Sequence, residues 1–246
     1  MTKSKITVPI KAVIFDCDGT IVDSENAHYC AWKFALQNQG SDLTIEAYRL
    51  YVGNPAETIS ILLSKKLGKN CADEILKDKR AYFHELQSKG LPPIQDTVDL
   101  ICKLANKKTN YGFKLGVASA AGKQEILVHL KHHGIEHLFD VIISGRDDLS
   151  EYNDPEGHNK PKPYIYLHAA KRLNVEPKEC VVIEDSSTGV KAGVDAGCFT
   201  IAIPNSYSCY HDFSLAHLKL QSFASITVDQ FLQMIIPKQP EKLAKL

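Results

Sequence analysis

The stretch AVIFDCDGTIVDSE, residues 12–25, decides the fold, because an apolar run within it ends abruptly at two acids followed by Gly-Thr. Residues i and i+2 of an extended segment point to the same side, so Asp16 and Asp18 face one place while Cys17 points away. Two carboxylates this close repel each other, so either one is protonated or a cation lies between them, and oxygen ligands beside a flexible turn suit Mg²⁺. Alternatively, the acids form an Asx turn that caps the next helix. In both cases a buried strand delivers two acids to a loop.

Three further stretches carry polar residues next to apolar runs. The run KLGVAS ends at Ser119, the run ECVVIEDSSTG contains Glu184 and Asp185, and HNKPKPYIY offers Lys160 before a proline. Taken alone, Ser119 is typical of a helix N-cap, the acidic pair of a helix terminus and Lys160 of a solvated loop. Because parallel α/β sheets bind ligands at the carboxyl ends of their strands, the four stretches together indicate one site.

The four stretches, in this order, resemble the motifs of the haloacid dehalogenase-like superfamily of aspartate-nucleophile phosphotransferases. The resemblance implies that Asp16 attacks phosphorus and forms an aspartyl-phosphate, and that Asp18 protonates the leaving group and later activates water. It also implies that Ser119 hydrogen-bonds the phosphate and that Lys160 neutralises charge. The ligands that it implies for a Mg²⁺ cofactor are the Asp16 carboxylate, the Asp18 backbone carbonyl, the Asp185 carboxylate and, through water, Glu184.

A loop of turn formers and acids, RDDLSEYNDPEGHN at Arg146–Asn159, is several residues longer than similar proteins usually show. It is either a solvated surface insertion or a loop at the rim of the site that adds substrate or metal contacts. The length of this loop also leaves Lys162 as an alternative to Lys160. The residues that would make the added contacts are Asp147, Asp148, Asp154 and His158.

The composition excludes several classes of function. Lys plus Arg and Asp plus Glu both number 29, so no net basic charge favours nucleic acid. No apolar run approaches the ~20 residues of a membrane span, and the first residues lack the apolar core of a secretory signal. Seven scattered cysteines without a CxxC pair are typical of reduced core thiols. We therefore predict a cytoplasmic protein that binds neither nucleic acid nor membrane.

A block of nearly 100 residues separates the first two motifs, which is far longer than a crossover between parallel strands needs. Its apolar residues follow helical periodicity, and no part of it reads as a confident strand. We predict an all-helical cap of residues 25–93, inserted into a core of residues 1–24 and 94–246. The predicted cap helices are 26–39, Pro55–Leu67 and Ala72–Ser88, and the predicted hinges are Val22–Glu25 and Gly90–Pro93.

The core reads as alternating strands and helices, which is typical of a parallel sheet covered on both faces. The predicted fold class is α/β, with a doubly wound, mostly parallel, Rossmann-like sheet and the inserted helical cap. In the resembled family the first and fourth strands are neighbours, which would bring Asp16 and Asp185 together. Ser222–Ile236 is expected to add a short strand and a helix. The predicted strands are 11–15, 114–118, 140–143, 180–183 and 200–203, and the predicted helices are 96–107, 122–133, 163–173 and 187–196.

Within the superfamily, DSENAHYCAW, VASA and IEDSSTG resemble the beta-phosphoglucomutase-like and sugar-phosphate phosphatase subgroup. By this resemblance His28 has the position of a mutase histidine that gates Asp18, although a helix residue that packs the hinge fits equally well. The mutase's cap arginine, which holds a distal phosphate, falls on Ala56. The resemblance assigns the substrate and cap side of the site to His28, Gly53, Asn54 and Ala120.

The missing cap cation favours a phosphatase over a mutase, because a phosphorylated product without a distal clamp leaves and water takes its place. The predicted function is a Mg²⁺-dependent phosphatase of a small phosphorylated metabolite, in a monomer or homodimer. One alternative is a phosphomutase of the beta-phosphoglucomutase type. The other is a binding or regulatory protein that has kept the fold and lost turnover.

Overall fold

A computed structural model describes residues 8–52, 54 and 56–235 of the 246-residue chain. Its core is one six-stranded sheet in the order β3-β2-β1-β4-β5-β6, and every adjacent pair of strands is parallel. The predicted roles of Gly53, of Pro55 as a helix start and of Ile236 as a helix end lie outside the described residues. The strands are β1 (Ala12–Phe15), β2 (Lys114–Ser119), β3 (Val141–Ser144), β4 (Cys180–Glu184), β5 (Phe199–Ala202) and β6 (Leu218–Lys219).

Helices cover both faces of this sheet, as the apolar strands require. Side chains of β1 alternate between the two faces: Val13 and Phe15 pack with α5, α6 and α9, whereas Ala12 and Ile14 pack with α7 and α8. All four residues of β1 are fully buried. The predicted doubly wound α/β core is therefore confirmed. The core helices are α5 (Gln95–Tyr111), α6 (Lys123–His132), α7 (Tyr164–Leu173), α8 (Ser187–Asp195) and α9 (Val228–Ile235), with short 3₁₀ turns at Glu136–Leu138 and Pro177–Glu179.

The register of the two central strands fixes where the acids emerge. In β1 and β4, Ala12 pairs with Cys180 and Phe15 with Ile183. The backbone N–H of Asp16 continues the ladder with a 2.9 Å hydrogen bond to the carbonyl of Ile183. The first and fourth strands are thus neighbours, as expected, and both release their acids at the same sheet edge.

The C-terminal part of the prediction needs correction. The described residues between Ser222 and Ile235 contain helix α9 and no strand, and the additional strand β6 precedes them at Leu218–Lys219. Two residues form this strand, which is too short to show a period of two. Helix α5 also continues to Tyr111, four residues beyond its predicted end at 107.

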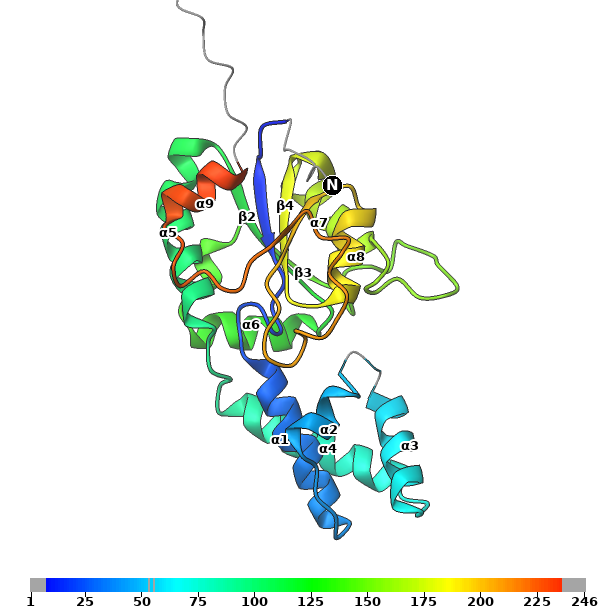
Figure 1. Cartoon of the computed structure of the whole chain (residues 1–246). Coiled ribbons are helices and arrows are strands. Elements are labelled where there is room, and N and C mark those ends of the chain that lie inside the picture. The colour runs from blue at the N-terminus through cyan, green and yellow to red at the C-terminus, as the bar shows by residue number, and fades with distance from the viewer. Residues whose placement is uncertain (1–7, 53, 55, 236–246) are drawn as a thin grey trace, which may run out of the picture.

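Four helices form a separate layer beyond the carboxyl ends of the strands (Figure 1). Helices α1 and α4 pack on each other, and α3 packs on α4. Their shared core includes Trp32, Leu36, Leu63 and Ile75. The five-residue α2 was not predicted, because one turn and a half carries too little periodicity. The four helices are α1 (Ser24–Asn38), α2 (Ile45–Arg49), α3 (Ala56–Leu67) and α4 (Ala72–Ser88).

Two chain segments that lie side by side connect these helices to the sheet. Val22 and Pro93 form an antiparallel bridge. The Asp23 N–H donates to the carbonyl of Pro92 at 2.9 Å, and the Ile94 N–H donates to that of Ile21 at 2.8 Å. The two predicted hinge regions therefore form a paired connection.

A third connection comes from the loop after β5, which we call the 203–217 segment. It runs toward α1 and α2 (Figure 1, orange) and inserts Tyr207 into the core of the helical layer. The Tyr207 hydroxyl donates to Asn26 Oδ1 at 3.0 Å. Its ring centroid lies 5.9 Å from that of Tyr48 and 6.5 Å from that of Tyr29. The sequence analysis did not predict this contact.

No helix in the described part of the chain is both long and apolar enough to cross a membrane. All seven cysteines are free thiols. Four of them are buried, but Cys209 is exposed, so the prediction of core thiols is wrong for that residue.

Candidate active site

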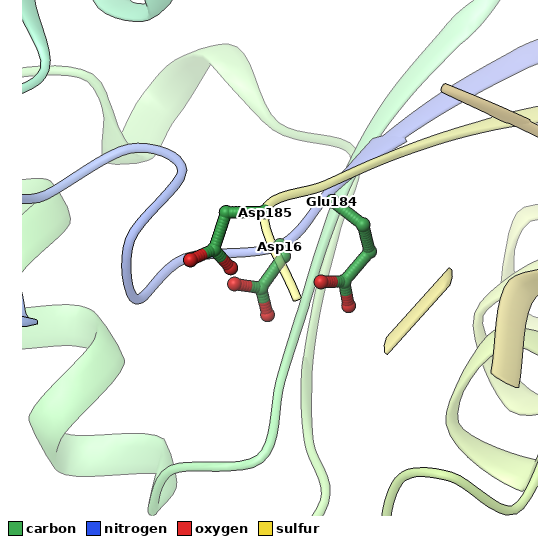
Figure 2. A group of neighbouring side chains, drawn as sticks. All are labelled: Asp16, Glu184 and Asp185. Atoms are coloured by element: carbon green, nitrogen blue, oxygen red, sulfur yellow. The ribbon is translucent and has the colours of Figure 1, made fainter. Parts of the chain in front are cut away.

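Three carboxylates meet where β1 and β4 end. Asp16, Glu184 and Asp185 each offer an oxygen, and these three oxygens lie within 4.8 Å of one another (Figure 2). Asp16 and Asp185 are 5 % exposed, and Glu184 is fully buried. The two aspartates that the sequence analysis assigned to one cation are therefore close enough to share one.

Lys160 is the cation that the structure places against these acids. Its ammonium donates to Asp16 Oδ1, lies 2.7 Å from Glu184 Oε1, and donates to the carbonyl of Ala118 at 3.1 Å. Burial alone would lower the pKa of Lys160, but the charges of Asp16 and Glu184 outweigh it and raise this pKa. Lys162 instead pairs with acids of the preceding loop, so the geometry favours Lys160 over Lys162.

The turn after β1 leaves space for the side chain of Asp185. Gly19 has a φ of +79°, and a Cβ at this position would lie 2.3 Å from Asp185 Oδ2. The same oxygen accepts a 2.7 Å hydrogen bond from Asn205 Nδ2, at the start of the 203–217 segment. Glycine is therefore required in the DxDGT stretch for space as well as for conformation.

Asp18 meets the end of β2. Ser119 Oγ donates to Asp18 Oδ2 at 2.9 Å and accepts from the backbone N–H of Ala121 at 3.1 Å. Ser119 is fully buried at its strand end. The structure thus brings together the predicted residues Asp16, Asp18 and Ser119, from the ends of the paired strands β1 and β2.

Glu184 is held by groups of its own strand end and of α7. Its Oε1 accepts from the Tyr166 hydroxyl at 2.5 Å, and its Oε2 accepts from Ser186 Oγ at 3.1 Å. Ser186 also caps α8 by accepting from the Gly189 N–H. A Cβ on Gly189 would lie 1.9 Å from Glu184 Oε1, so only glycine fits here. These contacts explain the small residues that follow the acids in EDSSTG.

Lys160 alone does not offset the effect of burial on the acids of the cluster. Burial raises the pKa of Asp16 to about 8, against the opposing effect of Lys160, and burial also raises the pKa of Asp185 well above its ordinary value. Without a bound ion, protons occupy these carboxylates near neutral pH. A divalent cation can replace the protons, and the all-oxygen donor set fits Mg²⁺.

A cleft of about 550 Å³ opens above the acids, between the sheet and the helical layer. Most of the predicted site residues line it, including Asn54 and Ala120 on the predicted substrate side. Glu184, which is fully buried, is not among the described residues that line the cleft. The lining residues are Asp16, Asp18, Glu25, Val52, Asn54, Ser119, Ala120, Asn159, Lys160, Asp185, Ser186, Ser187, Thr188, Ser208 and His211.

His28 is not among the described residues that line this cleft. Its ring stacks on Phe83, with centroids 3.9 Å apart and planes 6° from parallel. Its Nδ1 lies 3.0 Å from the ammonium of Lys79. In this structure His28 therefore packs α1 on α4. This contact agrees with a packing role for His28 rather than with a histidine that gates Asp18.

The acids of the long loop make contacts within the loop and its surroundings. Asp147 accepts from the Lys123 N–H at 2.6 Å, and Asp148 pairs with the Lys123 ammonium at 2.5 Å. Asp154 accepts from Tyr164 at 3.0 Å. None of these three, nor His158, lines the cleft. Asn159 alone within 146–159 does so, since its Nδ2 donates to the carbonyl of Ala120 at 3.3 Å.

Several lining residues were missed by the sequence analysis. Glu25 was predicted only as the end of a hinge and not as a residue of the site, and Asn159 precedes the predicted lysine. Ser208 and His211 belong to an irregular segment, in which no periodicity indicates which side chains point inward. Their position depends on the contact between Tyr207 and the helical layer, which only the folded structure provides.

Comparisons with known proteins agree with this geometry. Residues 13–203 match the family model described as "Haloacid dehalogenase-like hydrolase". The chain is 30 % identical over 222 residues to the putative phosphatase YhcW of Bacillus subtilis, across 88 % of this chain and 94 % of that protein. It is 31 % identical over 193 residues to a phosphorylated carbohydrates phosphatase of Thermotoga maritima, across 76 % and 82 % of the two proteins.

A solved structure supports the same relationship. The structure of beta-phosphoglucomutase from Clostridium difficile matches with a TM-score of 0.66 and 27 % identity, over 92 % of this chain and 97 % of that one. The similarity thus extends over the sheet and the helical layer, and it includes both phosphatases and a phosphomutase.

Proposed function

The chain belongs to the haloacid dehalogenase-like hydrolase family, and on this premise we propose that it is a Mg²⁺-dependent phosphatase of small phosphorylated metabolites such as sugar phosphates. The observation that carries the proposal is the ion-paired nucleophile: Asp16 sits against Lys160 within reach of Asp185, at the floor of a cleft large enough for a metabolite. The name of the similar phosphorylated carbohydrates phosphatase of Thermotoga maritima supports the same substrate class.

We propose that the Asp16 and Asp185 carboxylates and the Asp18 backbone carbonyl would hold Mg²⁺, with Glu184 acting through water. When bound, this ion neutralises charge on the phosphate and on the acids. Lys160 supplies the second positive charge, because its ammonium already contacts Asp16 and keeps its proton. Together these charges let a carboxylate approach a phosphate dianion, which would otherwise repel it.

In the first half of the proposed reaction, an Asp16 oxygen attacks phosphorus while the bond from phosphorus to the leaving oxygen breaks. Asp18 gives its proton to that oxygen, which leaves as an alcohol, and Asp16 becomes an aspartyl-phosphate. In the second half, Asp18 takes a proton from water, the water oxygen attacks phosphorus, and the bond to Asp16 breaks. Inorganic phosphate is released and both aspartates return to their starting states.

Ser119 and Ala120 form the part of the cleft where the phosphate would lie. Ser119 Oγ donates to Asp18 in this structure. We propose that this hydroxyl turns to the phosphate when substrate binds, which frees Asp18 to exchange protons. The neighbouring Ala120 lines the cleft and adds no charge.

Hydrolysis is favoured over phosphomutation by the cap side of the cleft. Among the described lining residues, no Lys or Arg comes from residues 25–93 to hold a distal phosphate. We propose that these residues form the cap and move over the core, made of residues 1–24 and 94–246, about the paired connection at Val22 and Pro93. The likeness to a solved beta-phosphoglucomutase keeps phosphomutation as the second candidate function.

The proposal is tested by phosphate release from p-nitrophenyl phosphate with Mg²⁺ and with EDTA. We expect activity with Mg²⁺ and its loss with EDTA. Asp16→Asn should lower kcat more than about a thousandfold, because it removes the nucleophile. Asp99→Asn, an exposed residue of α5, should keep the wild-type rate. A near-normal rate in Asp16→Asn, or full activity in EDTA, contradicts the proposal.

A further inference from the structure

The cleft has a second group of polar side chains, apart from those that face the phosphate. We call it the cap-side wall and define it as Glu25, Asn54, Ser208 and His211, all of which line the cleft. Glu25 and Asn54 belong to the helical layer. Ser208 and His211 belong to the 203–217 segment, which Tyr207 attaches to that layer. The proposed reaction uses none of these residues.

Glu25 is held in place as a hydrogen-bond acceptor. Its Oε2 accepts a 3.2 Å hydrogen bond from the hydroxyl of Tyr48. Tyr48 is only 3 % exposed, and its ring packs edge-on against Tyr207. Burial raises the pKa of Glu25 to about 7, with the Tyr48 hydrogen bond opposing the shift. The side chain therefore presents a carboxyl group to the cleft from a fixed position.

His211 brings a hydrogen-bonding atom that nothing in the described part of the chain satisfies. Its Nδ1 is buried and has no partner there. The ring is stacked with Phe213, with centroids 6.2 Å apart, which holds its plane. Burial lowers the pKa of His211, so the imidazole is neutral near pH 7 and has one donor and one acceptor nitrogen. Nδ1 is enclosed by the protein, but the residue lines the cleft, where its neutral imidazole can exchange a hydrogen bond with a ligand hydroxyl.

The charges of the cleft limit what this wall can bind. Lys160 is the single Lys or Arg among the described lining residues, and its ammonium is already engaged by Asp16 and Glu184. A second anionic group on the substrate would find no free cation and would lie near Glu25. A hydroxyl group, in contrast, can donate to Glu25 and exchange hydrogen bonds with His211 and Ser208.

We propose that Glu25 and His211 determine specificity by selecting phosphomonoesters whose leaving group is uncharged and rich in hydroxyls, and by rejecting leaving groups that carry a carboxylate or a second phosphate. The proposal rests on the proposed phosphatase function and deepens it. Glu25 acts by accepting a hydrogen bond from a ligand hydroxyl and, above its pKa of about 7, by repelling anions as a carboxylate. His211 acts by completing the hydrogen bonds of the same hydroxyl-bearing group.

Two matched pairs of substrates test the selection in the wild-type protein. Glycerol 3-phosphate and 3-phosphoglycerate differ in having CH2OH or a carboxylate on the leaving group, and so do the open-chain sorbitol 6-phosphate and 6-phosphogluconate. With Mg²⁺ present, we expect kcat/KM to favour the neutral member of at least one pair by about tenfold or more. Equal values within both pairs, or a preference for the acids, would overturn the proposal.

Variants then assign the selection to the two residues. Glu25→Gln keeps the shape of the side chain and removes its charge, so the ratio of kcat/KM between neutral and acidic members should fall by about tenfold. His211→Gln should raise KM for the neutral member by roughly fivefold, with a smaller change in kcat, because a hydrogen bond to the bound substrate is lost. The matched controls are Glu46→Gln and His84→Gln, exposed cap residues that do not line the cleft.

p-Nitrophenyl phosphate separates failure of this inference from failure of the proposed function. Its leaving group has neither hydroxyls for the wall nor a carboxylate. Wild-type protein that releases phosphate from it but does not discriminate within the pairs overturns this inference alone. Absence of release from it overturns the phosphatase assignment and this inference together. A Glu25→Gln variant with the wild-type ratio excludes Glu25 as the selecting residue.

Discussion

Lys160 provides positive charge at the site because of where its side chain lies, and not because of its residue type. Its side chain is 8 % exposed and contacts two of the three clustered carboxylates. Lys162, two residues later, is 32 % exposed and pairs with Asp154 and Glu156 at the surface. The two lysines thus have the same chemistry, and only their surroundings differ.

Replacing each lysine in turn measures this difference. Lys160→Ala should lower kcat for p-nitrophenyl phosphate by about a hundredfold or more, because the acids lose a buried counter-charge. Lys162→Ala should change kcat by no more than about threefold, because exposed ion pairs contribute little. The measurement is initial-rate kinetics with saturating Mg²⁺. A larger loss in Lys162→Ala would reverse the assignment.

Individual residues of the site were predictable where a motif combines several residue types. Asp16, Asp18, Ser119, Lys160 and Asp185 were predicted together, because the four stretches that contain them resemble, in order, the motifs of one family. Glu25 and His211 were not identified, since a lone Glu in a helix and a lone His in a loop are common in any protein. Their environment is created by the tertiary contacts of other elements.

At the scale of elements, the 203–217 segment joins the sheet to the helical layer. Asn205 holds Asp185 at one end of this segment, and Tyr207 is buried among Tyr29 and Tyr48 at the next turn. Ser208 and His211 follow directly in the cleft. One irregular stretch therefore connects a carboxylate of the cluster to the cap-side wall.

Substitutions at Tyr207 test how strongly this segment is attached. Tyr207→Ala should lower the free energy of unfolding by roughly 3 kcal/mol, because it leaves a cavity in the helical layer. Tyr207→Phe, which loses only the hydrogen bond to Asn26, should cost about 1 kcal/mol. Tyr210→Ala, at a residue 69 % exposed, should cost less than about 0.5 kcal/mol. Urea denaturation measures all three, and equal costs for Tyr207→Ala and Tyr210→Ala would refute the attachment.

Elements with strong periodicity were predicted with small errors at their ends. The strand predicted at 180–183 is Cys180–Glu184, and the helix predicted at Ala72–Ser88 has these bounds in the structure. The short elements were missed: neither α2 nor β6 has enough residues to reveal a repeat. Sheet order came from family resemblance, because hydrophobic pattern specifies which residues are buried and not which strands are adjacent.

At the scale of the whole molecule, the buried ammonium of Lys79 makes the free energy of unfolding depend on pH. Lys79 is 6 % exposed, and its ammonium lies 4.5 Å from the ring centroid of Phe83. Burial lowers the pKa of Lys79 from 10.5 to about 8, although Glu25 partly opposes the shift. Between about pH 8 and pH 10.5 the unfolded chain binds more protons than the folded chain. The free energy of unfolding therefore rises with pH across this range. Below about pH 8 the folded protein bears the full cost of roughly 3 kcal/mol.

The substitution Lys79→Met removes this cost while it keeps an unbranched side chain on Phe83. At pH 7 it should raise the free energy of unfolding by up to about 3 kcal/mol, less what the lost contact with His28 Nδ1 contributes, and the gain should shrink as the pH approaches 10. Lys77→Met, an exposed residue of the same helix, is the matched control and should show no such pH dependence. Denaturation curves at pH 7 and pH 10 provide the measurement. A destabilised Lys79→Met at pH 7 would show that the ammonium contributes more than its burial costs.

The pairing of β1 has a consequence for how the protein is made. Its neighbours β2 and β4 begin at Lys114 and Cys180, so 98 residues follow Phe15 before the first partner strand leaves the ribosome. At synthesis rates of about 5–20 residues per second, a nascent chain spends roughly 5–20 seconds with this apolar strand unpaired. During that interval Asp16 has neither Lys160 nor Asp185 beside it. A growing chain therefore acquires its completed central sheet and its capacity for chemistry in the same late stage of translation.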